Sequence, residues 1–193
     1  MQRSATMLAA AVAAAVLAGP MAEAKAPAGG GEILWDTFGV PHIYARSEAG
    51  AFYGFGWAQA QSHGNLLLRI YGESRARGAE YWGPEHEALD RWLIANDVPS
   101  RSRVWFDMQT PQMRANLDAF AEGVNDYAKA HPDRIDAEMK KVLPLSGVDI
   151  MQHAHRLMNY TYIASERRVL ANAAPVNETA ANETPVNKAG GSN

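Results

Sequence analysis

The side chains able to do chemistry are few in this sequence, and their spacing argues against several common reactions. Cysteine is absent, which excludes thiolate catalysis, disulfides and cysteine-ligated metal centres. His153 and His155 are two residues apart in a predicted helix, so they face different sides and cannot form the usual i, i+4 metal pair. His42 lies in a predicted strand. It is either a catalytic residue or, as we expect, a histidine packed or hydrogen-bonded at the adjoining turn.

Ionic side chains and one serine complete the candidates. Asp36 is expected to form a turn, and Arg75 and Arg77, close to Glu80, are expected to make surface or interchain ion pairs. Ser192 stands in a Gly-Gly-Ser-Asn run, which on its own is typical of a frayed terminus or a cloning scar. A serine hydroxyl is a weak nucleophile without a base, and no Ser/His/Asp order is recognisable here.

Length and charge limit the classes of protein. The 193 residues fit one domain or part of a larger one. Lys and Arg total 18 against 21 Asp and Glu, which leaves a net charge of −3. A nucleic-acid surface needs positive charge, and no polybasic tract is present for anionic lipid. We therefore expect neither a nucleic-acid nor a membrane partner.

Residues 1–24 have the features of a secretory signal peptide. Arg3 supplies the positive start, an apolar run extends over 7–19, and Ala22-Glu23-Ala24 has the small–x–small pattern that signal peptidase reads. The apolar run is short for a hydrocarbon core of about 30 Å, although an N-terminal membrane anchor is the alternative. We expect a mature chain that begins near Lys25 in a periplasmic or secreted protein.

A short hairpin and a helical stretch are predicted next. Residues 32–36 and 40–45 have strand patterns on either side of a turn that contains Gly39, and glycine tolerates a positive φ there. The pattern becomes helical over 47–79, with Ser47 as its N-cap. Gly54 and Gly56 are expected where another backbone comes close, and Gly64 is expected to divide the stretch into two helices.

Two more helices follow. Thr110–Pro111 is a strong helix start, apolar residues then recur at spacings of three and four, and His131–Pro132 ends the helix. The last helix is entered through 144–149 with Ser146 or Asp149 as its cap. Its predicted apolar face consists of Ile150, Ala154, Leu157, Met158, Thr161 and Tyr162. Residues 171–191 then lack aromatic, Leu, Ile and Met residues, which is typical of a linker.

Four motifs occur in a fixed order, namely Asp36–Ile43, Gly54–Gln61, Arg75–Glu80 and Ala121–Tyr127. With the Pro/Asp entry to the last helix, they resemble the front end of penicillin-acylase-type precursors, a family of N-terminal-nucleophile amidohydrolases. That family includes penicillin acylases, aculeacin-type lipopeptide acylases and acyl-homoserine-lactone acylases. The resemblance covers most of residues 32–168, and it is broken at Ser62-His63, where relatives usually carry Asp-Arg.

The resemblance implies an α+β fold, the four-layer αββα N-terminal-nucleophile sandwich. This chain would supply a mostly α-helical part of it with a short β-hairpin. The family plan implies a signal peptide over 1–24, an acylase α chain over 25–168, a spacer propeptide over 169–191, and a β chain that starts with 192–193. The expected partner is the missing β chain, in an αβ heterodimer.

The same resemblance implies the chemistry. Ser192 becomes the nucleophile, and the Gly191–Ser192 bond becomes the self-cleavage junction. The base is the α-amino group that cleavage releases at Ser192, whose unperturbed pKa of about 7.7–8.0 leaves a useful neutral fraction near pH 7. The substrate is a small-molecule acyl amide, such as an acyl-homoserine lactone, a lipopeptide or a β-lactam with an acyl side chain. The chain by itself is expected to be inactive.

In relatives the helix corresponding to 149–168 lines the acyl pocket. Leu157, Met158 and Tyr160 are therefore substrate-pocket candidates, and a core stripe is the alternative interpretation. Glu166 is a weak calcium candidate because it matches a calcium-binding position of penicillin acylases, but one carboxylate makes no calcium site. No cofactor is predicted beyond that possible calcium ion.

Two other hypotheses need no β chain. One is a small exported helical binding or structural protein with a disordered tail. The other is an export-chaperone-like helical module, in which residues 25–168 are monomeric and stable alone. An open reading frame that continues after Asn193 would favour the acylase, and a stop codon would favour the alternatives.

Overall fold

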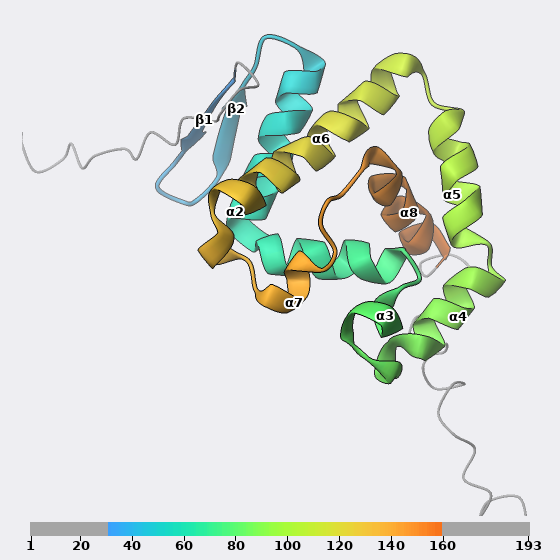
Figure 1. The fold of residues 1–193 in the computed structure, drawn as a ribbon. Helices are drawn as coiled ribbons and strands as arrows, with labels where there is room; N and C mark the ends of the chain where they lie inside the picture. Colours follow the sequence, from blue (N-terminus) through green and yellow to red (C-terminus); the bar gives the residue numbers. More distant parts are fainter. Residues whose placement is uncertain (1–30, 160–193) are drawn as a thin grey trace, which may run out of the picture.

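Helices account for most of the described chain. The computed structural model describes residues 31–159, so the predicted signal peptide, the spacer, Thr161, Tyr162, Tyr160, Glu166, Gly191 and Ser192 lie outside the described residues. Two strands come first and helices follow (Figure 1). The elements are β1 (Glu32–Trp35), β2 (Pro41–Tyr44), α2 (Glu48–Ser74), α3 (Gly78–Trp82), η1 (Pro84–His86), α4 (Glu87–Ala95), α5 (Val98–Asp107), α6 (Pro111–Ala130), η2 (Pro132–Arg134), α7 (Ala137–Lys140) and α8 (Gly147–Met158).

The predicted hairpin is confirmed, and Asp36 forms its turn. Strands β1 and β2 are antiparallel, and Ile33 lies opposite Ile43. The Asp36 carboxylate accepts the backbone N–H groups of Phe38 and Val40, each at 2.9 Å. The hydrogen bond from Val40 is the main reason that the pKa of Asp36 lies below its usual value.

His42 belongs to this turn. Its Nε2 lies 3.2 Å from the second carboxylate oxygen of Asp36. The structure therefore supports the turn-bonded histidine rather than the catalytic one. Gly39 has a φ of 77°, which is the positive value that the turn was predicted to need.

Helices α2 and α6 lie side by side and pack backbone against backbone (Figure 1). A Cβ atom on Gly56 would come within 2.0 Å of the Phe120 carbonyl oxygen, and one on Gly123 within 2.1 Å of the Tyr53 carbonyl oxygen. The predicted close approach at Gly56 is confirmed. At Gly54 the close neighbour is a side chain and not a backbone. A Cβ atom on Gly54 would come within 2.7 Å of the Ile43 side chain of β2, so this glycine lets the hairpin pack closely against α2.

Gly56→Ala is expected to lower the free energy of unfolding by about 1–3 kcal/mol or more, because the neighbouring atom is backbone and cannot rotate away. This loss outweighs the gain of up to about 1 kcal/mol that alanine brings in a helix. Urea unfolding of the purified protein measures it. Gly123→Ala should show the same sign, and the double variant should lose less than the sum because both changes separate the same helices. Additive losses would contradict this packing.

Local signals set the ends of the long helices. Ser47 Oγ accepts the Gly50 N–H at 3.1 Å, and Thr110 Oγ1 accepts the Met113 N–H at 3.2 Å, so both predicted caps are confirmed. The break expected at Gly64 is found one residue earlier, at His63, whose φ of −143° and ψ of 33° are not helical and form a kink that divides α2 into two helical segments. Helix α2 ends at Ser74, earlier than predicted, and Ala76 then has a positive φ of 56°.

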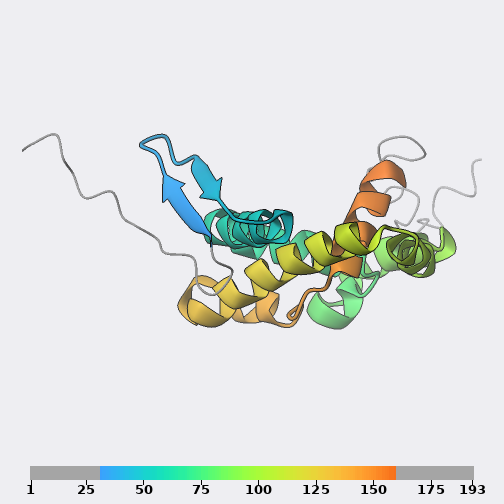
Figure 2. The ribbon, with the colours of Figure 1, turned by 90° about the horizontal axis from the view of Figure 1, so that it is seen from above.

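The region between α2 and α6 carries three helices that the sequence did not predict. Helix α3 has no capping side chain of its own. Instead Asp90 of α4 accepts the N–H groups of Gly78 and Ala79 at 2.9 and 2.8 Å. Seen from above, the helices form a flat layer, and the hairpin and the end of α8 rise on the same side of it (Figure 2). Within residues 31–159, no helix is both long and apolar enough to cross a bilayer.

Candidate functional site

Helix α8 is the element on which the predicted pocket residues lie, and a capping box defines its start. Asp149 Oδ2 accepts the backbone N–H of Ser146 at 2.7 Å and its hydroxyl at 3.0 Å. The Ser146 side chain in turn accepts the backbone N–H of Asp149. Both residues predicted as alternative caps therefore act together.

The buried face of α8 is mostly polar, which corrects the predicted apolar face except at Ile150, which is half-buried and packs against the main core. Its buried residues are Gly147, Val148, Asp149, Gln152, His155 and Arg156. Leu157 is 47% exposed and Met158 is 51% exposed, and Ala154 is also exposed. Leu157 and Met158 are thus not part of a core formed by the described residues. The reason is that helix α2 offers charged partners, which draw the polar face of α8 inward.

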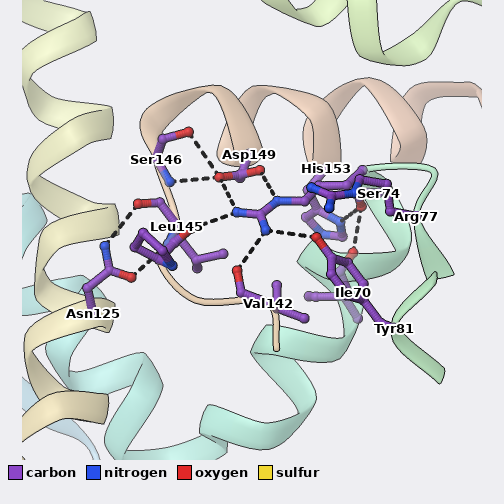
Figure 3. Close-up of polar contacts among 12 residues, drawn as sticks. Ile70, Ser74, Arg77, Tyr81, Asn125, Val142, Leu145, Ser146, Asp149 and His153 are labelled. Carbon is purple, nitrogen blue, oxygen red and sulfur yellow. Dashed lines mark hydrogen bonds and ion pairs between the residues drawn. The ribbon is translucent and has the colours of Figure 1, made fainter. Parts of the chain in front are cut away.

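The first of these partners is Arg75. Its Nε and Nη2 donate to the two oxygens of Asp149 at 2.6 and 2.9 Å. Nη1 donates to the Val142 carbonyl at 2.7 Å and to the Tyr81 hydroxyl at 3.1 Å, and Nη2 also reaches the Pro144 carbonyl at 2.8 Å. Figure 3 shows Asp149, Val142 and Tyr81 arranged around this guanidinium.

The prediction of a surface or interchain ion pair is therefore wrong for Arg75, whose side chain is only 15% exposed and whose partner lies in the same chain. Burial alone would lower the pKa of Arg75, but the hydrogen bonds and charge of Asp149 raise it above its usual value. For Arg77 the prediction is confirmed. Its Nε donates to Glu80 at 2.6 Å, and both side chains are more than half exposed.

A second ion pair joins the other end of α8 to α2. Arg156 Nη2 donates to Glu73 Oε2 at 2.8 Å, and the Arg156 side chain is 6% exposed. The other oxygen of Glu73 lies 3.6 Å from Nε of Arg69, one turn earlier on α2. Two ion pairs therefore connect α8 to the last turn of α2 and to Arg75, the residue that directly follows it.

Two Ser–His contacts flank α8, and neither was predicted. Ser74 Oγ lies 3.3 Å from Nδ1 of His153, and Ser102 Oγ lies 3.0 Å from Nδ1 of His155. Each serine hydroxyl also donates at 2.6 Å to a carbonyl one turn earlier. A hydroxyl has one proton, so Nδ1 of each histidine is the donor and the serine oxygen the acceptor. This polarity is opposite to that of a base activating a nucleophile.

The two histidines face different sides of α8, as predicted. His153 packs edge-on against Tyr71 of α2, and His155 packs against Trp105 of α5 with ring centroids 4.1 Å apart. Over residues 31–159, no three His, Asp or Glu side chains are grouped so that they could hold a metal ion. Sequence spacing could not reveal the Ser–His contacts, because the partners lie on different helices.

Burial, and then the charge of Arg156, lower the pKa of His153 from 6.5 to about 4. Between these values the unfolded chain binds more protons than the native one, so the free energy of unfolding falls as pH falls from 6.5 to 4. Burial also lowers the pKa of His155, with the same sign. We expect a loss of about 1 kcal/mol for His153, allowing for its partial exposure. Urea unfolding at several pH values measures it. His153→Gln should reduce the slope, and exposed His63→Gln should not.

Known proteins are similar to this chain over the segments described above. The penicillin amidase family model matches residues 31–192. The chain is 29% identical over 163 residues to the acyl-homoserine lactone acylase PvdQ of Pseudomonas fluorescens (strain Pf-5), a match that covers 77% of this chain and 21% of that protein. It is 26% identical over 113 residues to the penicillin G acylase of Escherichia coli, covering 58% of this chain and 13% of that protein.

A solved structure is similar as well. The thermostable penicillin G acylase from Alcaligenes faecalis superposes with a TM-score of 0.60 at 22% identity, over 68% of this chain and 73% of that chain. The predicted fold class is thus confirmed, as a mostly helical part of that fold with a two-stranded sheet. The chain spans about a fifth of the length of the curated relatives it matches.

Proposed function

Because the chain belongs to the penicillin amidase family, we propose that it is the leading part of an acylase precursor. The complete enzyme hydrolyses the amide between an acyl group and an amine. The observation that carries this proposal is the family match, which extends from the hairpin to residue 192. An acyl-homoserine lactone is the favoured substrate, because a relative named for that activity matches 77% of the chain.

Ser192 is proposed as the nucleophile. Cleavage of the Gly191–Ser192 bond frees the α-amino group, which takes the proton from the Ser192 hydroxyl as the oxygen attacks the substrate carbonyl. The amine leaves with a proton, and water then hydrolyses the acyl-enzyme. The oxyanion hole has to come from the β chain. Ser74 and Ser102 do not compete for this role, because each is fully buried and donates its proton to a backbone carbonyl.

The proposed partner is the β chain of the same precursor. Large apolar side chains are exposed on the hairpin and on α8, among them Phe38, Val40, Tyr44, Leu157 and Met158. The hairpin and the end of α8 rise on one side of the helical layer (Figure 2). Groups of exposed apolar side chains mark sites of protein association. A small helical protein that needs no partner is therefore less favoured.

The rest of the predicted plan completes the proposal. Residues 25–168 form the α chain, 169–191 the spacer and 192–193 the start of the β chain. Leu157, Met158 and Tyr160 line the acyl pocket. The signal peptide over 1–24 directs the protein to the periplasm or the outside of the cell.

Intact mass and N-terminal sequencing of the product from the gene continued beyond Asn193 test this plan. We expect two chains, the second beginning Ser-Asn, with residues 169–191 lost. A single uncut chain, or a second chain with another N-terminus, would show that Ser192 is not a released nucleophile.

A further inference from the structure

We propose that the Glu73–Arg156 ion pair is a positioning pair for acyl-chain binding. It sets the rotation of the last turn of α8 and, with it, the direction of Leu157 and Met158. The inference rests on the proposed function, in which these two side chains contact the acyl group.

The position of this ion pair on α8 restricts rotation of the helix about its own axis. Asp149 and Arg156 are seven residues apart, close to two full turns, so they lie on one face of the helix and roughly 10 Å apart along it. Arg75 binds the first at 2.6 Å and Glu73 binds the second at 2.8 Å. Two attachments on one face prevent the helix from turning about its axis.

The order of charges also restricts the pairing. Glu73, in the last turn of α2, pairs with Arg156, and Arg75, which follows that helix, pairs with Asp149. Exchanging the partners would place the two arginines together and the two carboxylates together, which is unfavourable. Buried ion pairs add little net stability compared with apolar contacts, so their expected effect is to specify one arrangement.

Arg156 directly precedes the two pocket candidates. With about 100° of rotation per residue, Leu157 points to the flank of the helix and Met158 points away from α2, in agreement with their exposures of 47% and 51%. Any rotation of this turn moves both side chains relative to a bound acyl chain. Substrate binding should therefore change more than the chemical step.

The test uses the processed αβ enzyme with butanoyl- and dodecanoyl-homoserine lactone as substrates. Glu73→Gln should raise KM for the dodecanoyl substrate about 10-fold or more, change its kcat less than about 2-fold, and raise KM for the butanoyl substrate less than about 3-fold. Arg69→Gln is the matched control, because it removes the other, half-exposed partner of the same carboxylate. It should leave the KM ratio of the two substrates within about 2-fold of the wild type.

The double variant E73Q/R156Q separates an effect on positioning from an effect on stability. If the Glu73→Gln precursor is not cleaved into two chains, the KM values of the double variant are used for the test. The double variant removes both charges, so thermal stability should recover while KM for the dodecanoyl substrate stays raised. A wild-type KM ratio in E73Q/R156Q, or a parallel fall of kcat for both substrates in Glu73→Gln, would overturn the positioning role alone. An inactive wild-type enzyme would overturn the proposed function and this inference with it.

Discussion

Ser192→Ala in the complete precursor is expected to abolish both chain separation and amide hydrolysis. In the proposed mechanism the same hydroxyl attacks the Gly191 carbonyl in self-cleavage and the substrate carbonyl in catalysis, so its loss should remove both reactions. Hydrolysis should fall by at least about ten-thousand-fold, as when a catalytic serine is deleted elsewhere. Gel electrophoresis measures the cleavage, and release of homoserine lactone measures the activity.

Two variants control this experiment. Ser192→Cys keeps a nucleophile at the same position and should retain some chain separation. Ser62→Ala changes an exposed serine of α2 and should leave both cleavage and hydrolysis unchanged. A Ser192→Ala protein that is cleaved and active would mean that another residue is the nucleophile.

Asp149→Ala is expected to lower the free energy of unfolding by about 3–5 kcal/mol, the usual cost of removing one member of a buried ion pair. It leaves the guanidinium of Arg75 buried without the carboxylate that accepts two of its hydrogen bonds. It also removes the capping box with Ser146 at the start of α8, which is worth about another 1 kcal/mol. Urea unfolding, monitored by tryptophan fluorescence, measures the change.

Glu80→Ala is the matched control for Asp149→Ala. It also removes the carboxylate partner of an arginine, but the Arg77–Glu80 pair is on the surface. Removing Glu80 should lower the free energy of unfolding far less than removing Asp149, and the loss should shrink further in high salt. An equal loss of unfolding free energy in Asp149→Ala and Glu80→Ala would contradict a buried role for the Arg75–Asp149 pair.

The sequence alone predicted those features that depend on neighbours within a few residues. The Asp36 turn, the Ser47 and Thr110 caps and the end of α6 at His131 are all decided by side chains that reach backbone groups nearby. The close approach at Gly56 was also foreseen, because a glycine inside a helix costs stability that helix packing must offset. The ordered motifs were enough to indicate the family.

The tertiary structure alone decided which face of α8 is buried and where Arg75 lies. Arg75 and Asp149 are 74 residues apart, and Arg156 is 83 residues from Glu73, so no local pattern relates them. Apolar spacing predicted that Leu157 and Met158 face inward. That rule assumes the neighbouring element offers an apolar surface, whereas α2 offers charged groups at this point. Ionic partners brought together by the fold therefore turned the polar face of α8 inward and left its apolar side chains exposed.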